Sequence, residues 1–208
     1  MDSILKNINE YYTNKINQFG NTPRGVDWKD EQSQFIRFDQ LLKVIEDKSD
    51  FSVNDLGCGF GSMFLYMLQN TFGKFNYNGY DLSAEMIENA NEVCGEFNGL
   101  SFFKVNASSE MQVADYSVAS GIFNVKMNHN DQEWLTYITD ALHDLNEKST
   151  KGFSFNALTL FSDAEFKKEH LYYADPMFLF EHCKNNYSRN VALLHDYNLF
   201  EFTIIVRK

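Results

Sequence analysis

Three glycines and two carboxylates carry the most chemical information in this chain. Asp55 precedes Gly57, Gly59 and Gly61, and Asp81 ends a later aromatic run. Glycines allow the backbone to turn sharply and to approach a ligand closely. A helix that begins after them would offer free N–H groups and a partial positive charge to a carboxylate of the ligand. Because a carboxylate such as Asp81 can accept hydrogen bonds from both hydroxyls of a ribose, we predict a site for a ligand with a carboxylate and a ribose.

Alternating strands and helices are expected to position these residues. The strands are predicted at Phe51–Leu56, Phe75–Tyr80, Leu100–Val105, Tyr116–Phe123 and Gly152–Thr159, and the helices at Ser62–Asn70, at Ala84–Glu96, after the cap Asn130, and from Pro176 to about Asn186. Repeated strand–helix units imply a parallel sheet with helices on both faces. Ligands of such sheets bind at the carboxyl ends of the strands, where the strand order reverses. The glycines directly follow the first strand, so we expect them at that crevice.

Two features separate this pattern from a dinucleotide-binding fold. The dinucleotide motif has its third glycine at the position that Ser62 occupies here, which argues against NAD or FAD. The last two strands, Val191–Tyr197 and Phe200–Lys208, are joined by too few residues for a crossover helix. They are therefore predicted to be antiparallel, whereas a dinucleotide-binding fold would continue in parallel.

Most of residues 50–208 resemble the class I S-adenosylmethionine-dependent methyltransferase superfamily. Asp55 and the three glycines match its first motif, and Asp81 matches its ribose-binding acid. The resemblance implies an α/β fold, a Rossmann-like doubly wound seven-stranded sheet with a terminal antiparallel hairpin. It also implies S-adenosylmethionine as cofactor and S-adenosylhomocysteine as product. No metal site is expected.

The same resemblance implies a set of cofactor-binding residues. The set comprises Asp55, Gly57, Cys58, Gly59, Gly61, Asp81, Leu82, Asn106, Ala107 and Gly121. Leu82, Asn106 and Ala107 fall where the family contacts adenine, and Gly121 falls where the methyl group would emerge. Many members carry aspartate at the position of Asn106, but an amide can also hydrogen-bond an exocyclic amine.

The N-terminal region is expected to form two helices joined by a loop that is rich in turn residues. Apolar residues recur at helical spacing from Ile4 to Phe19 and again from Asp30 to Glu46. We interpret residues 1–48 as a helical lid over the cofactor and residues 49–208 as the cofactor-binding core of one domain.

The charge and the cysteine content of the chain limit the kinds of molecule that it is expected to bind. The chain has 208 residues and a net charge of −11, which argues against a nucleic-acid partner because phosphates need clustered lysine and arginine. The three cysteines lie far apart, as expected of reduced thiols in the cytoplasm. No stretch is typical of a signal peptide or a membrane span. We expect a small-molecule acceptor, and the oligomeric state stays open.

Polar and aromatic residues near the later strand ends are candidates for the acceptor site. His129, His195 and Asn124 are the candidate catalytic residues, with the histidines as possible bases. The candidate acceptor-binding residues are Arg24, Trp28, Asn156, Tyr172, Tyr173 and Arg189. Structural interpretations stay open: His195 could bond Asp196 or a backbone carbonyl, and Arg37 could pair with a structural carboxylate or bind an anionic acceptor.

These observations favour methyl transfer to a small molecule, at oxygen, of a natural-product or surface-sugar type. No N-P-P-Tyr motif follows the fourth strand, where Asn124 is followed by Val125 and Lys126, and nucleic-acid bases become less favoured as acceptors. Two alternatives stay open. One is a protein or RNA methyltransferase, and the other is a non-catalytic partner subunit that binds S-adenosylmethionine without turnover.

Overall fold

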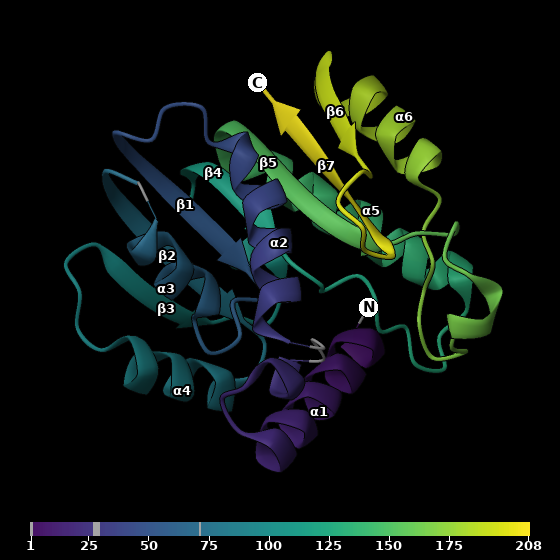
Figure 1. Cartoon of the computed structure of the whole chain (residues 1–208), viewed down its shortest axis with the longest axis horizontal. Helices are drawn as coiled ribbons and strands as arrows, with labels where there is room; N and C mark the ends of the chain where they lie inside the picture. The colour runs from purple at the N-terminus through teal and green to yellow at the C-terminus, as the bar shows by residue number, and fades with distance from the viewer. Residues whose placement is uncertain (1, 27–29, 71) are drawn as a thin grey trace.

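A computed structural model describes residues 2–26, 30–70 and 72–208 of the chain (Figure 1). Its α-helices are α1 (Asp2–Phe19), α2 (Glu31–Leu41), α3 (Ser62–Gln69), α4 (Ala84–Cys94), α5 (Asp131–Glu147) and α6 (Pro176–Asn186). Its strands are β1 (Asp50–Leu56), β2 (Lys74–Asp81), β3 (Leu100–Lys104), β4 (Ala114–Ala119), β5 (Ser149–Leu158), β6 (Asn190–Leu194) and β7 (Glu201–Arg207).

The strands among the described residues form one seven-stranded sheet in the order β3-β2-β1-β4-β5-β7-β6. Strands β1 to β5 are parallel, and β7 is antiparallel to both β5 and β6. The predicted fold and its terminal antiparallel hairpin are therefore confirmed. Leu56, at the end of β1, lies opposite Tyr80 on one side and Ala119 on the other, so three strands end together where the strand order reverses.

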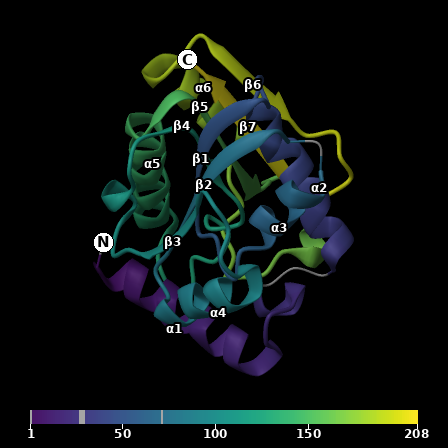
Figure 2. The ribbon, with the colours of Figure 1, turned by 90° about the vertical axis from the view of Figure 1, so that its left-hand side faces the viewer.

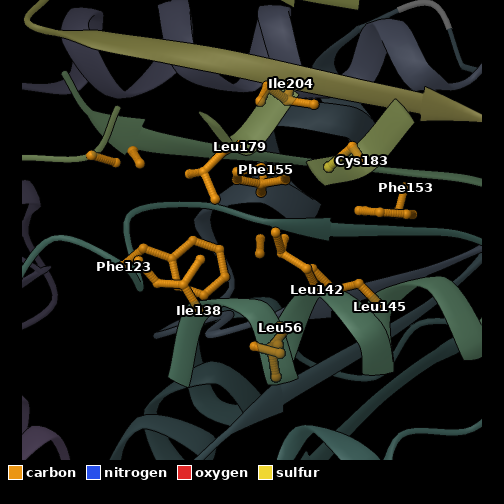
Figure 3. Packing of buried hydrophobic residues seen from close by; sticks show 14 of the residues in the cluster. Leu56, Phe123, Ile138, Leu142, Leu145, Phe153, Phe155, Leu179, Cys183 and Ile204 are labelled. Atoms are coloured by element: carbon orange, nitrogen blue, oxygen red, sulfur yellow. The ribbon is translucent and has the colours of Figure 1, made fainter. Parts of the chain in front are cut away.

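Apolar side chains cover both faces of the sheet. On one face α5 and α6 bury a cluster that includes Leu142, Phe155 and Leu179 (Figure 3). On the other face α2 and α3 bury a cluster that includes Phe38 and Val53. Figure 2 shows α5 and the α2–α3 pair on opposite sides of the strands. Burial on both faces stabilises a parallel sheet and holds its strand ends in fixed positions.

Side-chain caps start the later helices where the sequence predicts them. Ser83 accepts a hydrogen bond from the Met86 N–H at the start of α4, and Asn130 accepts one from the Glu133 N–H at the start of α5. Asp175 caps α6, with proline at the first helical position. Such caps satisfy N–H groups that have no partner inside the helix, so they fix where each helix begins.

Three predicted elements extend furthest beyond their observed ends. The second helix ends at Leu41 and continues as a short 3₁₀ turn to Val44, because Ile45 is already extended. Strand β4 ends at Ala119, because Gly121 has a φ of 76° and turns the chain. Strand β6 ends at Leu194, well before Tyr197, and a loop of residues 195–200 leads to β7.

The two N-terminal helices occupy different places. Helix α2 lies on the sheet, with Leu41 fully buried and its carbonyl accepting a 2.8 Å hydrogen bond from the Ser154 hydroxyl. Helix α1 instead lies across the carboxyl ends of the strands (Figures 1 and 2) and is joined to the start of α4 by a 3.2 Å contact between the hydroxyls of Thr13 and Ser83. Helix α1 therefore lies over the strand ends, whereas α2 packs on a face of the sheet. None of the helices described by the structure has the length and apolar character that a membrane span requires.

Candidate active site

The glycine loop after β1 is tied to the end of β2. The N–H groups of Gly57 and Cys58 donate to the Tyr80 carbonyl at 2.7 and 3.0 Å, and the Gly59 N–H donates to Asp81 Oδ2 at 3.0 Å. Gly57 has a φ of 78°, and a Cβ atom on it would lie 2.2 Å from Ile122. Both the backbone conformation and the close approach require glycine at this position.

Asp81 ends β2 beside the glycine loop. Its Oδ1 atom accepts a hydrogen bond from the Ser83 N–H at 2.9 Å, in addition to the bond from Gly59. Burial raises the pKa of Asp81, and these two hydrogen bonds oppose that rise. A carboxylate has about four acceptor positions. Asp81 therefore keeps acceptor capacity for hydroxyl groups of a ligand.

Asp55 is buried at the end of β1 and is only partly satisfied. Its Oδ2 atom accepts a hydrogen bond from the Tyr77 hydroxyl, whereas Oδ1 is buried without a partner. Burial raises the pKa of Asp55 to about 7; the Tyr77 hydrogen bond opposes this rise, and the charge of Asp81 adds to it. A positively charged group beside Oδ1 would favour the ionised carboxylate again.

These residues border a cavity of about 380 Å³ at the carboxyl ends of β1, β2 and β4. Helix α1 closes it with one face, which consists of Leu5, Ile8, Asn9 and Tyr12. Further lining comes from Gln34 on α2 and from Tyr137 on α5. The cavity therefore lies between the strand ends and the N-terminal helix.

Most of the predicted cofactor residues line this cavity. The lining includes Asp55, Gly57, Cys58, Gly59, Asp81, Leu82, Ala107 and Gly121. Gly61 lies just behind it as the N-cap of α3, where an added Cβ atom would meet the Cys94 sulfur at 2.5 Å. Asn106 is exposed outside the lining, and its side chain bonds Lys104 and Glu110. In the described structure Asn106 does not face the ligand space.

The polar side chains near the ends of β4 and β5 and at the start of β7 have hydrogen-bond partners within the protein. Asn156 Oδ1 accepts a 2.7 Å hydrogen bond from the Gly121 N–H, and Asn124 Oδ1 accepts a 2.9 Å bond from the Leu158 N–H. Glu201 receives two hydrogen bonds from the Arg37 guanidinium, at 2.5 and 3.1 Å, in a buried pair. Neither Asn124 nor Asn156 lines the cavity. The Arg37 side chain thus pairs with a carboxylate of the protein, which is the structural one of the two roles considered for it.

The two candidate bases also lie outside the cavity lining. His129 Nε2 is 3.1 Å from the Asn7 amide nitrogen on α1, and its Nδ1 is 3.7 Å from Glu133. It thereby joins α1 to the start of α5. His195 is exposed in the β6–β7 loop, with its ring centroid 6.2 Å from those of Phe161 and Phe202.

The remaining acceptor candidates are dispersed. Arg24 and Arg189 are exposed, and neither lines the cavity. Tyr172 and Tyr173 are half-buried in the connection before α6, where the Tyr173 hydroxyl accepts a bond from the Lys168 N–H at 2.9 Å. Trp28 lies outside the described residues.

Several lining residues were not among the sequence predictions. Asn9 lines the cavity, and its Oδ1 atom is buried without a hydrogen-bond partner. Gln34, Tyr137 and His143 also line it, from α2 and α5. Leu5, Ile8, Asn9 and Tyr12 share helical spacing, so the one polar residue within an otherwise apolar face of α1 was the available signal for Asn9.

Comparisons with known proteins agree on one family. Residues 53–148 match the model of a family described as "Methyltransferase domain". The Mycobacterium tuberculosis protein named "Putative methyltransferase Rv1506c" is 46% identical over 168 residues, covering 80% of this chain and 99% of that protein.

Solved structures of low sequence identity share the fold. Magnesium protoporphyrin IX methyltransferase from Synechocystis, solved with bound SAH, gives a TM-score of 0.65 at 13% identity, covering 97% of this chain and 96% of that one. An O-methyltransferase family protein from Burkholderia thailandensis gives 0.61 at 13% identity, covering 92% of this chain and 61% of that one.

Proposed function

Because the chain belongs to the class I S-adenosylmethionine-dependent methyltransferase superfamily, we propose that it transfers a methyl group to an oxygen of a small-molecule acceptor. The observation that carries this proposal is the cavity in which Asp55 and Asp81 flank the glycine loop beneath α1. Its volume of about 380 Å³ and its position beneath α1 support a small molecule over a protein or RNA acceptor. The likeness to an O-methyltransferase family protein supports oxygen as the attacking atom.

The cofactor is S-adenosylmethionine, and the described residues fit it. When bound, it supplies a methyl group on a positively charged sulfur. The unpartnered Asp55 Oδ1 would face the positive end of its methionine part. Asp81, with acceptor positions to spare, would hold the ribose hydroxyls. Leu82 and Ala107 would enclose the adenine, and Gly121 would border the space in which the acceptor meets the methyl group.

The contribution of the protein to the transfer is alignment and exclusion of water. Methyl transfer is a direct displacement, so it needs the attacking oxygen in line with the bond that breaks and at near-attack distance. The apolar side chains Leu5 and Ile8 of α1 line the cavity and limit the contact of the reacting groups with bulk water. As the new carbon–oxygen bond forms, the carbon–sulfur bond breaks, and the proton of the acceptor oxygen is released to water.

A thermal-shift comparison tests the cofactor site. S-adenosylmethionine, S-adenosylhomocysteine and NAD are added to the wild type and to Asp81→Ala. A ligand at about 100 times its dissociation constant adds roughly 2.7 kcal/mol of stability. We expect stabilisation of the wild type by both adenosyl compounds, none by NAD, and a weaker response of the variant. No response of the wild type to either adenosyl compound would contradict the assignment.

Turnover is tested separately. S-adenosylhomocysteine formation is followed while a panel of hydroxylated small molecules is offered with S-adenosylmethionine. Methylated product identified by mass spectrometry would support the enzyme. Strong cofactor binding without product across the panel would instead favour the non-catalytic partner subunit.

A further inference from the structure

The charges around the cavity are strongly one-sided. Its described lining contains four carboxylates, Asp55, Asp81, Asp140 and Asp144. The same lining contains one histidine, His143, and no lysine or arginine. Such a wall attracts a ligand with a net positive charge and repels an anion, because a cavity with walls of low dielectric strengthens the field of its charged groups. A sulfonium cofactor suits this field.

The arginines that could have countered an anionic acceptor are elsewhere. Arg37 is held by two hydrogen bonds to Glu201 in a buried pair, and its Nη1 also donates to the Ser33 carbonyl at 2.6 Å. Arg24 and Arg189 are exposed away from the lining. An acceptor with a carboxylate or phosphate group would therefore enter without a matching cation from the described lining.

The side of the cavity formed by the N-terminal helices is apolar, with amides as its polar groups. Leu5, Ile8 and Phe38 supply the apolar surface. Asn9 and Gln34 supply the amides, and Gln34 is only 5% exposed. The Asn9 Oδ1 atom is buried and has no partner. Leaving a buried acceptor without a hydrogen bond is costly, so this atom is suited to a donor that arrives with a ligand.

We propose that the acceptor is an uncharged molecule with an apolar body, which packs against α1 and α2, and with an O–H or N–H group that donates to Asn9 Oδ1. This inference rests on the proposed function, because it describes the second substrate of that same cavity. It disfavours an anionic acceptor bound by arginine, which was an alternative that the sequence left open.

The test uses three probes with one ring system and different polar groups. 2-Naphthol has a donor, 2-methoxynaphthalene has none, and 2-naphthoate carries a negative charge. Their binding to the full chain saturated with S-adenosylhomocysteine is measured by ligand-observed NMR. We expect 2-naphthol to bind about tenfold more tightly than 2-methoxynaphthalene, the effect of one hydrogen bond. Like-charge repulsion should weaken 2-naphthoate by at least about tenfold relative to 2-naphthol.

Two variants and one control variant make the test specific. Asn9→Ala should abolish the preference for 2-naphthol over 2-methoxynaphthalene while leaving the affinity for S-adenosylhomocysteine unchanged. Leu5→Lys, which places a cation in the lining, should improve the binding of 2-naphthoate. Ser3→Lys, at an exposed position of the same helix, is the matched control and should leave it weak.

The outcomes separate the two proposals. Failure of S-adenosylhomocysteine to bind the wild type would overturn the proposed function and this inference with it. If S-adenosylhomocysteine binds but 2-naphthoate binds as tightly as 2-naphthol, or none of the probes binds, only the acceptor inference is overturned. Loss of S-adenosylhomocysteine affinity in Asn9→Ala would assign Asn9 to the cofactor instead.

Discussion

The ends of β1 and β2 and the ends of β4 and β5 carry similar polar residues but use them differently. Near the ends of β4 and β5, Asn124 and Asn156 accept hydrogen bonds from backbone N–H groups, and Glu201, opposite the end of β5 on β7, is paired with Arg37. At β1, Asp55 keeps one buried oxygen without a partner. The β4–β5 end has its hydrogen bonds satisfied within the protein and acts as a support, whereas the β1–β2 end reserves acceptor capacity for a ligand. A buried polar residue after a strand thus points to a ligand only when its partners are incomplete.

The largest expected effect lies in the supporting region. Glu201→Ala would leave the Arg37 guanidinium buried and uncompensated, which should lower the free energy of unfolding by about 3–5 kcal/mol. Urea denaturation measures this. The double variant Arg37→Met/Glu201→Leu, which removes both charges, should recover much of the loss. If the Glu201→Ala protein had normal stability but no affinity for S-adenosylmethionine, Glu201 would belong to the ligand-binding region and not to the supporting region.

The second largest expected effect is on the affinity of the β1–β2 end for S-adenosylmethionine. Asp81→Ala should weaken S-adenosylmethionine by roughly 100-fold, because hydrogen bonds to a charged group contribute about 1.5–3 kcal/mol each. Titration calorimetry measures the affinity. Asp175→Ala is a matched control, since it removes another aspartate that accepts backbone hydrogen bonds, at the start of α6. That control should lose some stability and keep its affinity, and equal affinity loss in both variants would remove the special role of Asp81.

Asp55 should make the stability of the protein depend on pH. Its pKa is raised to about 7 in the folded chain, so the stability that it contributes is complete below its ordinary pKa and is lost as the pH rises through about 7. Without ligand, the wild type should therefore lose stability relative to Asp55→Asn between about pH 4 and pH 7. Chemical denaturation at a series of pH values measures the difference.

The ligand reverses that preference. A positive group beside Asp55 favours the ionised carboxylate, so S-adenosylmethionine should bind up to about tenfold more tightly at pH 7 than at pH 6, with release of a proton. Calorimetry in two buffers of different ionisation enthalpy detects that proton. Asp55→Asn should bind more weakly and with a flat pH profile, and an equally steep profile in that variant would assign the titration to another group.

The smallest expected effect distinguishes two roles of His129, a structural contact with α1 and a general base. His129→Ala should loosen α1, because it removes the contact with Asn7, and should raise amide hydrogen exchange in that helix severalfold. Affinity for S-adenosylmethionine should change by less than about threefold, since His129 does not line the cavity. His195→Ala should change neither quantity. Loss of methyl transfer in His129→Ala with unchanged exchange in α1 would return His129 to the role of base.

Local patterns in the sequence were sufficient for most of the fold. The caps Ser83, Asn130 and Asp175 lie next to the helices they start, and the glycines lie next to the strand they follow, so each signal and its effect share one short segment. The antiparallel ending followed from the short connection between the last two strands. The cofactor side of the cavity is assembled from such segments, and most of its predicted residues do line it.

The acceptor side could not be predicted in the same way, because its chemistry depends on partners distant in the chain. Arg37 and Glu201 are 164 positions apart, and nothing near either residue reveals the other. Asn124 and Asn156 have the residue types of a functional site, but only the three-dimensional contacts show that backbone N–H groups already occupy their oxygens. Asn9 is the opposite case, a residue in an otherwise ordinary amphipathic helix whose oxygen is left unpaired.

The position of β7 has a consequence for how the chain folds during synthesis. β7 pairs with β5 on one side and β6 on the other, so β6 leaves the ribosome before the strand that connects it to the sheet exists. Until residues 201–207 emerge, β5 presents an unpaired edge and Phe155 lacks its packing neighbour Ile204. An unpaired apolar edge is a template for association with other chains. Nascent chains that stall before Glu201 should therefore be the species most dependent on chaperones.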